Sequence, residues 1–582
     1  MTLNRRSLLA AGLTGALGGA GLTGWLMQPR APGPRRVPAL PSGIKPGARP
    51  LNILLVVTDQ EHADLPSGLP LPGHERLRAR GISFNRFHAN TTPCSPSRSN
   101  LYFGQHTQKT RMVVNYGVFP EPQIPDDIPS LGHYLRANGY DTAYKGKWHL
   151  GGVPEGRQLT YGLYPSTRDA LEPFGFSDYN DDGDPHGSTW TGYKNDGPIA
   201  AAASQWLRDR AASGNARPWL LAVNFVNPHD IMYFTTGEAQ TASRRMRDYL
   251  APLAPPPDDP LYRPLWELPL PANRSDTLRD KPEAHASYLT FCDMAYGRLP
   301  PGDEAWRAYR NYYFNCIRDA DRHLQTVLDA LEAGGQADRT IVVFTADHGE
   351  MAGGHGLRQK GPFMYQENVR VPLVVAHPDG PKGVSTDALG STVDLVPTLL
   401  ELAGVEGGRL KELYPQLAGV SLAASIGRVD GRSERDARGH LFNYNTTHHI
   451  DNAFIGTLID HQVLADRYLP VRALLKGMWP MPRTDHPALF RGLHDGRFKF
   501  ARYFKPSEHH TPTDWATLTG HNQLELYDTQ ADPGEMHNLA HQPEAVKPLL
   551  LDLNARLNAL VATEVGADRG DELVGPGFMK RL

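Results

Sequence analysis

The chain has 582 residues and a formal net charge of −3, with 40% apolar and 21% charged residues. This composition is that of a globular protein with a large core, and it excludes the strongly basic surface of a nucleic-acid-binding protein. The three cysteines are too few for a disulfide framework.

The N-terminus is typical of an export signal. Two adjacent arginines, Arg5 and Arg6, precede a run without charge from Leu8 to Met27. We therefore predict a twin-arginine signal over residues 1–30 and a periplasmic or secreted protein. The run is just long enough to span a bilayer, so cleavage and retention as a membrane anchor both stay open. Residues 31–50 are rich in proline and arginine and are predicted to be a disordered tether.

From residue 51 onward, short apolar runs alternate with helix-like segments. Strands buried on both faces are predicted at 52–57, 219–226, 340–345 and 371–376. Helices are predicted at 130–139, 306–332 and 394–404, with Asp394 as an N-cap. This alternation indicates an α/β fold with a mostly parallel sheet.

Two regions depart from this alternation. Residues 251–302 are rich in proline and predict a long ordered loop or lid. After about residue 436, short strand-like pieces and a final helix near 543–562 predict a smaller α+β domain. We therefore divide the chain into a catalytic domain over 51–435 and a C-terminal subdomain over 436–582.

Polar residues follow two of the predicted buried strands. Asp59 and Gln60 come directly after the first, and Asp347 and His348 come directly after the strand at 340–345. In a parallel sheet, ligands bind at the carboxyl ends of the strands. Oxygen ligands with one nitrogen suit Ca²⁺ or Mg²⁺. Either pair alone reads as turn capping, but the two pairs together favour a metal site.

Basic residues occupy corresponding positions elsewhere in the chain. Lys147 and His149 follow one predicted strand, His229 follows another, and Lys360 comes thirteen residues after Asp347. Each one alone is more often structural or solvated. Together they predict a cationic site for an anionic substrate. The acidic stretch at 178–187 is interpreted as an Asp/Gly turn, with a second cation site as the alternative.

Cys94 lies on a rigid stretch, "TTPCSPSRSNLYFG", with Pro93 before it and Pro96 after it. This stretch matches the C-x-P-S-R…L-x-T-G motif of type I sulfatases, which belong to the alkaline-phosphatase-like superfamily. Three further segments carry the resemblance: G-K-W-H-L-G at 146–151, the segment 347–375, and "ELYDTQADPGEMHNLA" at 525–540. The resemblance implies an α/β/α sandwich with a large, mostly parallel mixed sheet. It also implies a smaller C-terminal α+β domain with an antiparallel sheet.

The resemblance also implies a reaction. In the family, a formylglycine-generating enzyme oxidises the motif cysteine, here Cys94, to Cα-formylglycine. One hydroxyl of the hydrated aldehyde attacks the sulfur of an organic sulfate ester, and the alcohol leaves. The second hydroxyl then lets the sulfated hemiacetal collapse, which expels inorganic sulfate and restores the aldehyde. One divalent cation takes part, most commonly Ca²⁺, with Mg²⁺ and Mn²⁺ as alternatives.

Residue roles carry over from the family motifs to matching positions. The metal ligands would be Asp59, Gln60, Asp347, His348 and the modified Cys94. Arg98 and Lys147 would steady the nucleophile, and His149 would be the base. His229 and Lys360 would bind the sulfate and protonate the leaving oxygen.

Some positions differ from the common family pattern. Phe103 and Gln105 replace a threonine and an arginine in the tail of the modification motif. The pairs Asp59-Gln60 and Asp347-His348 resemble the choline-sulfatase and phosphonate-monoester-hydrolase branches. Hydrolysis of a small-molecule or carbohydrate sulfate ester is therefore the leading hypothesis. The alternative is hydrolysis of a phosphonate monoester or phosphodiester on the same scaffold. A non-catalytic binding protein is disfavoured because every motif residue assigned a role is present.

Overall fold

The computed structural model describes residues 35–117, 122–153, 169–180, 182–247, 249–428, 431–446, 451–460 and 485–573. The predicted export signal lies outside these ranges, and the choice between cleavage and anchoring stays a prediction. Within the described ranges, no helix combines the length and the apolar character needed to cross a membrane.

A seven-stranded sheet forms the centre of the larger part of the molecule. Its strands are β1 (Asn52–Asp59), β2 (Ile82–His88), β3 (Asp141–Gly146), β4 (Trp219–Pro228), β5 (Thr340–Ala346), β6 (Leu373–Ala376) and β7 (Val384–Ser391). They lie in the order β3-β4-β1-β5-β6-β2-β7. All neighbours are parallel except β6, which is antiparallel to both β5 and β2. The predicted mixed, mostly parallel sheet is confirmed.

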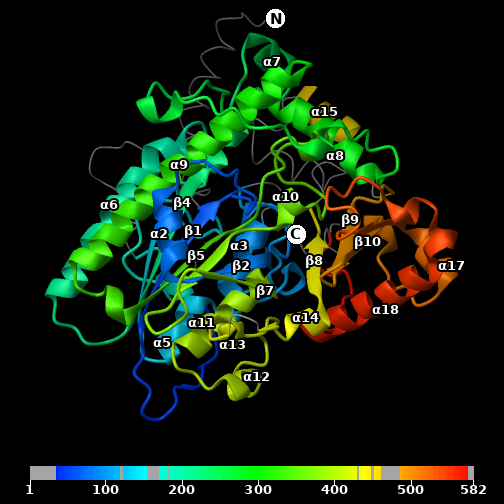
Figure 1. Ribbon diagram of the computed structural model, residues 1–582. Coiled ribbons are helices and arrows are strands. Elements are labelled where there is room, and N and C mark those ends of the chain that lie inside the picture. The colour runs from blue at the N-terminus through cyan, green and yellow to red at the C-terminus, as the bar shows by residue number, and fades with distance from the viewer. Residues whose placement is uncertain are drawn as a thin grey trace, which may run out of the picture.

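Helices cover both faces of this sheet (Figure 1). Alternate residues of β1 point to opposite faces, so Ile53, Leu55 and Val57 join one core and Leu54 and Val56 join the other. The first core is covered by α3 (Cys94–Phe103), α5 (Leu131–Ala137) and α11 (Leu395–Leu402). The second is covered by α2 (Pro72–Arg80), α6 (Thr191–Ala212) and α9 (Asp303–Ala333). This burial on both faces explains the continuous apolar runs in the sequence.

A second, antiparallel sheet forms the C-terminal part. Its order is β11-β10-β9-β8, with β8 at His440–Tyr444, β9 at Leu489–His494, β10 at Phe498–Phe504 and β11 at Gln523–Asp528. The final helix, α18 (Lys547–Glu564), lies against one face of this sheet (Figure 1). Its leucines share a hydrophobic core with Leu441, Leu493 and Leu526 of the sheet. The Asn443 amide donates to the Asn90 carbonyl across the junction with the larger sheet at 2.9 Å. The domain boundary at residue 435 stays a prediction.

Shorter helices complete the described part of the chain. They are α4 (Thr107–Thr110), α7 (Glu238–Ser243), α8 (Glu283–Tyr296), α10 (Gln366–Val369), α12 (Leu410–Leu413), α13 (Ala423–Ile426), α14 (Arg435–Arg438), α15 (Asn452–Asp460) and α17 (Trp515–His521). The proline-rich region 251–302 is therefore not one long loop, because its second half forms α8.

The predicted tether is the second correction. Residues 35–50 were expected to be disordered, yet they pack on the larger domain. Arg35 donates to the carbonyls of Pro125 and Ile128 at 2.7 and 2.9 Å, and the Gly43 amide donates to Asn138 Oδ1 at 2.8 Å. Ile44 forms a β-bridge with Val405. These backbone contacts satisfy groups that a composition-based prediction leaves in water.

The third correction concerns Asp394. The side chain does not cap α11 as predicted, because it accepts from the preceding Ser391 amide at 2.8 Å. It also accepts two bonds from Arg435, at 2.6 and 2.7 Å, while Arg435 Nη1 donates to Glu564 Oε1 at 2.6 Å. All three charged side chains are fully buried. Burial by itself raises the pKa of Glu564, but Arg435 and His106 hold it below its usual value.

This buried triad gives a stability prediction. Replacing Arg435 by Met leaves two carboxylates buried without their cation, so we expect a loss of about 3–5 kcal/mol in stability. Chemical denaturation followed by circular dichroism measures the change. The control is Arg409→Met, which removes an ion pair to Glu412 on an exposed helix and should leave the midpoint unchanged. Equal shifts in the two variants would contradict the assignment.

Candidate active site

Four neighbouring strands deliver the predicted site residues to one edge of the larger sheet. Lys147 follows β3, His229 follows β4, Asp59 ends β1 and Asp347 follows β5. The strands lie in the order β3-β4-β1-β5, so these residues come from adjacent carboxyl ends. This arrangement was predicted from the sequence, and it is the place where parallel sheets bind ligands.

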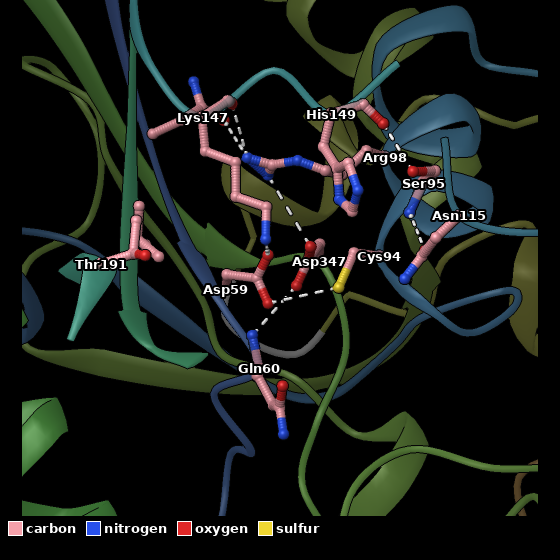
Figure 2. Close-up of polar contacts among 12 residues, drawn as sticks. Asp59, Gln60, Cys94, Ser95, Arg98, Asn115, Lys147, His149, Thr191 and Asp347 are labelled. Atoms are coloured by element: carbon pink, nitrogen blue, oxygen red, sulfur yellow. Dashed lines mark hydrogen bonds and ion pairs between the residues drawn. The ribbon is translucent and has the colours of Figure 1, made fainter. Parts of the chain in front are cut away.

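Asp59, Cys94, Asp347 and His348 form one compact cluster. All four side chains are fully buried, and one potential ligand atom from each lies within 4.8 Å of the others. Cys94 Sγ lies 3.6 Å from Asp59 Oδ1 and 3.3 Å from His348 Nε2. Figure 2 shows the sulfur pointing at the two carboxylates. The structure therefore brings these four predicted site residues together at one place.

The modification motif forms the first turns of α3, with Cys94 as its first helical residue. The Ser95 amide donates to Asn115 Oδ1 at 3.0 Å, and the Ser95 hydroxyl donates to the His149 carbonyl at 2.5 Å. The helix ends at Gly104, which has φ 62°, a conformation that favours glycine. The helix N-terminus thus presents residue 94 to the cluster, where its dipole favours a negative charge.

Arg98 and Lys147 place two buried cations beside the cluster. Arg98 donates to the carbonyl of Lys147 at 2.8 Å and to Asn224 Oδ1 at 3.2 Å, and its Nη1 lies 3.7 Å from Asp347 Oδ2. Lys147 Nζ lies 2.5 Å from Asp59 Oδ2. Burial by itself raises the pKa of Asp59, but the charge of Lys147 helps to hold it well below its usual range. Asp59 is therefore a carboxylate at neutral pH.

His149 and His229 are two further buried histidines on which the charge of Lys147 acts. Burial, together with the charge of Lys147, lowers the pKa of each imidazole well below its usual value. Both are therefore neutral at pH 7 in this state of the protein. Within the described residues, Nδ1 of each ring has no hydrogen-bond partner. Both rings thus have an atom available for a ligand or a proton.

The Gln60 side chain, predicted as a metal ligand, does not join the cluster in this structure. Its side chain turns away from the cluster (Figure 2) and donates to Glu350 Oε2 and Gln359 Oε1, at 2.5 and 3.0 Å. Its side-chain oxygen, Oε1, accepts a bond from Lys360 Nζ. Gln60 is in the left-handed region, with φ 74°, so its side chain does not continue the direction set by the strand. It contributes its main-chain amide, which donates to Asp347 Oδ1 at 3.1 Å.

Sequence reasoning missed three residues that support the site. Asn115 accepts from Ser95, Asn224 accepts from Arg98, and Asp184 accepts from the amides of Trp148 and His149. Asp184 lies in the acidic stretch that had been interpreted as a turn. Each supports another site residue across a long sequence separation, which no local pattern reveals.

The residues of the cluster fit a divalent cation. Asp347 Oδ2 is buried and has no hydrogen-bond partner among the described residues. Two carboxylates and an imidazole are ligands that Ca²⁺, Mg²⁺ and Mn²⁺ accept.

A second group, His355, Glu367 and Glu535, also has potential ligand atoms within 4.8 Å of one another. There, however, Lys499 Nζ already lies 2.5 Å from Glu535 Oε1 and Asn273 donates to Glu367. We interpret that group as a structural ion-pair network.

Comparison with known proteins agrees with this geometry. The family model described as Sulfatase matches residues 52–405. The chain belongs to the sulfatase family. A second model, described as the C-terminal part of N-sulphoglucosamine sulphohydrolase, matches residues 353–462. The sulfatase fold predicted from the motifs is confirmed, and the chain is a sulfuric ester hydrolase.

Individual sulfatases resemble the chain over most of its length. A choline-sulfatase of Rhizobium meliloti (strain 1021) is 29% identical over 65% of this chain and 72% of its own. The uncharacterized sulfatase YidJ of Escherichia coli (strain K12) is 26% identical over 84% of this chain and 82% of its own.

Solved structures share the fold. A 2-O GAG sulfatase superposes with a TM-score of 0.60 at 20% identity, covering 89% of this chain and 93% of its own. The phosphonate monoester hydrolase of Agrobacterium radiobacter superposes with a TM-score of 0.57 at 19% identity, covering 89% and 96%.

Proposed function

We propose that this sulfatase uses a formylglycine made from Cys94, together with one divalent cation, to hydrolyse an organic sulfate ester. The observation that carries the proposal is the position of Cys94, whose sulfur lies inside a buried cluster of two carboxylates and an imidazole. A thiol that packed only as a small apolar side chain would not need this surrounding of charged groups.

Asp59, Asp347, His348 and the modified residue 94 would hold the cation, with Ca²⁺ as the first choice and Mg²⁺ or Mn²⁺ as alternatives. In the hydrated aldehyde, a hydroxyl oxygen would replace Sγ. The cation, when bound, would lower the pKa of this hydroxyl and so make it a better nucleophile. The predicted ligand Gln60 would complete this set through its Oε1, which accepts a bond from Lys360 Nζ in this structure.

Arg98 and Lys147 then orient the reacting end of the substrate and neutralise its negative charge. Their positions are fixed by contacts with main chain and with the cluster, so they lose little freedom when an anion binds. A sulfate ester is a monoanion, and two buried cations offset the cost of removing it from water.

His149 and His229 divide the proton transfers. A neutral His149 is able to accept a proton, which is the role of the base. His229 follows β4 and Lys360 lies between β5 and β6, and both bind the sulfate. Lys360 and His229 supply the proton to the leaving oxygen, and substrate charge brings His229 toward its protonated form.

The alcohol part of the substrate is the finer question. Relatives include a protein named N-acetylglucosamine-6-O-sulfatase and another named Delta 4,5-hexuronate-2-O-sulfatase. On this support we propose a carbohydrate sulfate ester, with a small-molecule sulfate such as choline sulfate next. We also propose that a formylglycine-generating enzyme acts on Cys94. The protein would then leave the cytoplasm by the twin-arginine route for the periplasm or the medium.

The proposal predicts the mass of one peptide. Trypsin releases residues 87–98, "FHANTTPCSPSR", and protein from the natural host should show CHO in place of CH₂SH at Cys94. Mass spectrometry after alkylation measures the ratio of aldehyde to thiol. An intact, alkylated thiol in fully active protein would contradict the proposal.

The same preparation should then be tested with paired sulfate and phosphonate esters of identical alcohols. Faster hydrolysis of the sulfate esters is the expected result. Preference for the phosphonate esters would support the alternative function on the same scaffold.

A further inference from the structure

The segment Asp184–Gly187, here called the 184–187 loop, lies against both histidines of the site. It belongs to the acidic stretch for which a cation site was one interpretation. Its buried carboxylate is instead bonded to main-chain amides, so those oxygens are already in use. The question is what the loop does next to the reacting groups.

Asp184 acts on His149 through the backbone. Its Oδ1 accepts from the Trp148 amide at 3.0 Å and its Oδ2 accepts from the His149 amide at 2.7 Å. His149 has φ 56°, a left-handed conformation that is unfavourable for a residue with a side chain. The two bonds to a charged acceptor stabilise this turn, and the turn sets the direction of the imidazole.

His186 contacts the same imidazole from the side. Its ring centroid lies 5.3 Å from that of His149, and the two ring planes are inclined by 31°. A single loop therefore holds His149 at both its backbone and its ring.

Gly187 packs against the ring of His229. A Cβ built on Gly187 would lie 2.4 Å from His229 Cε1 and 2.8 Å from its Nδ1. Gly187 has φ 131°, which also favours glycine. The backbone of the loop thus packs directly on the ring, in space that any side chain would occupy.

We propose that the 184–187 loop is a positioning element that fixes His149 and His229 relative to each other. The two histidines follow different strands, β3 and β4, and the loop contacts both histidines. The inference rests on the proposed function, because it assigns proton transfer to these two residues. A misplacement of about 1 Å in such a group costs on the order of 100-fold in rate.

The test uses two glycine substitutions with matched backbone strain. Gly187→Ala pushes on the His229 ring. Gly237→Ala is the control, because Gly237 has φ 141° and nothing lies within 4 Å of its added Cβ. Both variants should lose similar thermal stability, and only Gly187→Ala should lose activity.

The readout that separates positioning from general damage is the leaving group. 4-Nitrophenolate leaves without a proton, whereas a simple alkoxide needs one. We expect Gly187→Ala to lower kcat about 10-fold for 4-nitrophenyl sulfate and about 100-fold for an alkyl sulfate. Equal losses for the two esters, or losses no larger than those of Gly237→Ala, would overturn the proposal.

Two further variants keep the outcomes distinct. His229→Ala should show the same leaving-group dependence. If it does not, the proposed role of His229 fails whatever the loop does, and if only His229→Ala shows it, the loop proposal alone is wrong. Asp184→Asn keeps the size of the side chain but has one acceptor oxygen for two amides. Asp184→Asn should lower kcat with KM unchanged. An unchanged kcat would contradict the proposed role of Asp184 in positioning His149.

Discussion

Cys94→Ala should abolish turnover while leaving the fold intact. The substitution removes the only source of the proposed aldehyde nucleophile, and loss of a nucleophile costs on the order of 10⁴-fold or more in kcat. The Cys94 side chain is fully buried but small, so the melting temperature of the variant should change by only a few degrees. Steady-state hydrolysis of a sulfate ester and a thermal melt measure the two effects.

Cys316→Ala is the matched control. Cys316 is also a fully buried free thiol, but it lies in α9 within an apolar and aromatic cluster. That variant should keep its activity. Hydrolysis at the original rate by the Cys94 variant would refute the nucleophile assignment, because no other group in the proposal forms the bond to sulfur.

The second large effect is expected for Asp347→Asn, which should lose bound metal and activity together. The amide oxygen of an asparagine is able to keep the bonds that Oδ1 accepts from the amides of Gln60 and His348. The amide nitrogen, however, replaces the oxygen that faces Arg98 and the cluster. One negative charge is lost, so we expect metal affinity to fall at least about 100-fold.

Metal content measured by mass spectrometry gives a readout that does not depend on activity. Asp321→Asn is the control, since Asp321 is also buried and accepts from two main-chain amides, those of Gly73 and His74. It should retain the metal of the unchanged protein. If Asp347→Asn retained full metal occupancy, residue 347 would not be a ligand.

Much of the larger sheet could be predicted from sequence because its strands are buried on both faces. The run at 52–57 is apolar throughout, and the structure uses its alternate residues in two separate cores. The helix α8 at Glu283–Tyr296 could not be predicted in the same way. Its buried positions include Ala, His, Cys and Tyr, and a proline-rich segment precedes it. Tertiary packing outweighed the local pattern there.

The site was predictable where a residue acts directly from the end of a strand. Asp59 ends β1 and Asp347 follows the neighbouring strand β5, so the sheet alone brings them together. Gln60 also comes directly after β1, but its side chain bonds to Glu350 and Gln359 in this structure, so its assignment as a ligand stays a prediction. Asp184 was missed because it acts on the backbone of residues 148 and 149, 36 and 35 positions away. No spacing rule reports such a contact.

The burial of helix α3 has a consequence for how the protein is made. Every side chain from Cys94 to Phe103 is buried, so the folded protein hides the whole stretch that a modifying enzyme would have to read. If Cys94 is oxidised as proposed, oxidation has to precede folding, and a molecule that folds first would stay inactive. Adding the modifying enzyme to purified, folded, unmodified protein should rescue nothing, whereas supplying it during synthesis should. The active fraction of a preparation would then show whether oxidation of Cys94 or folding of the chain was faster in the cell.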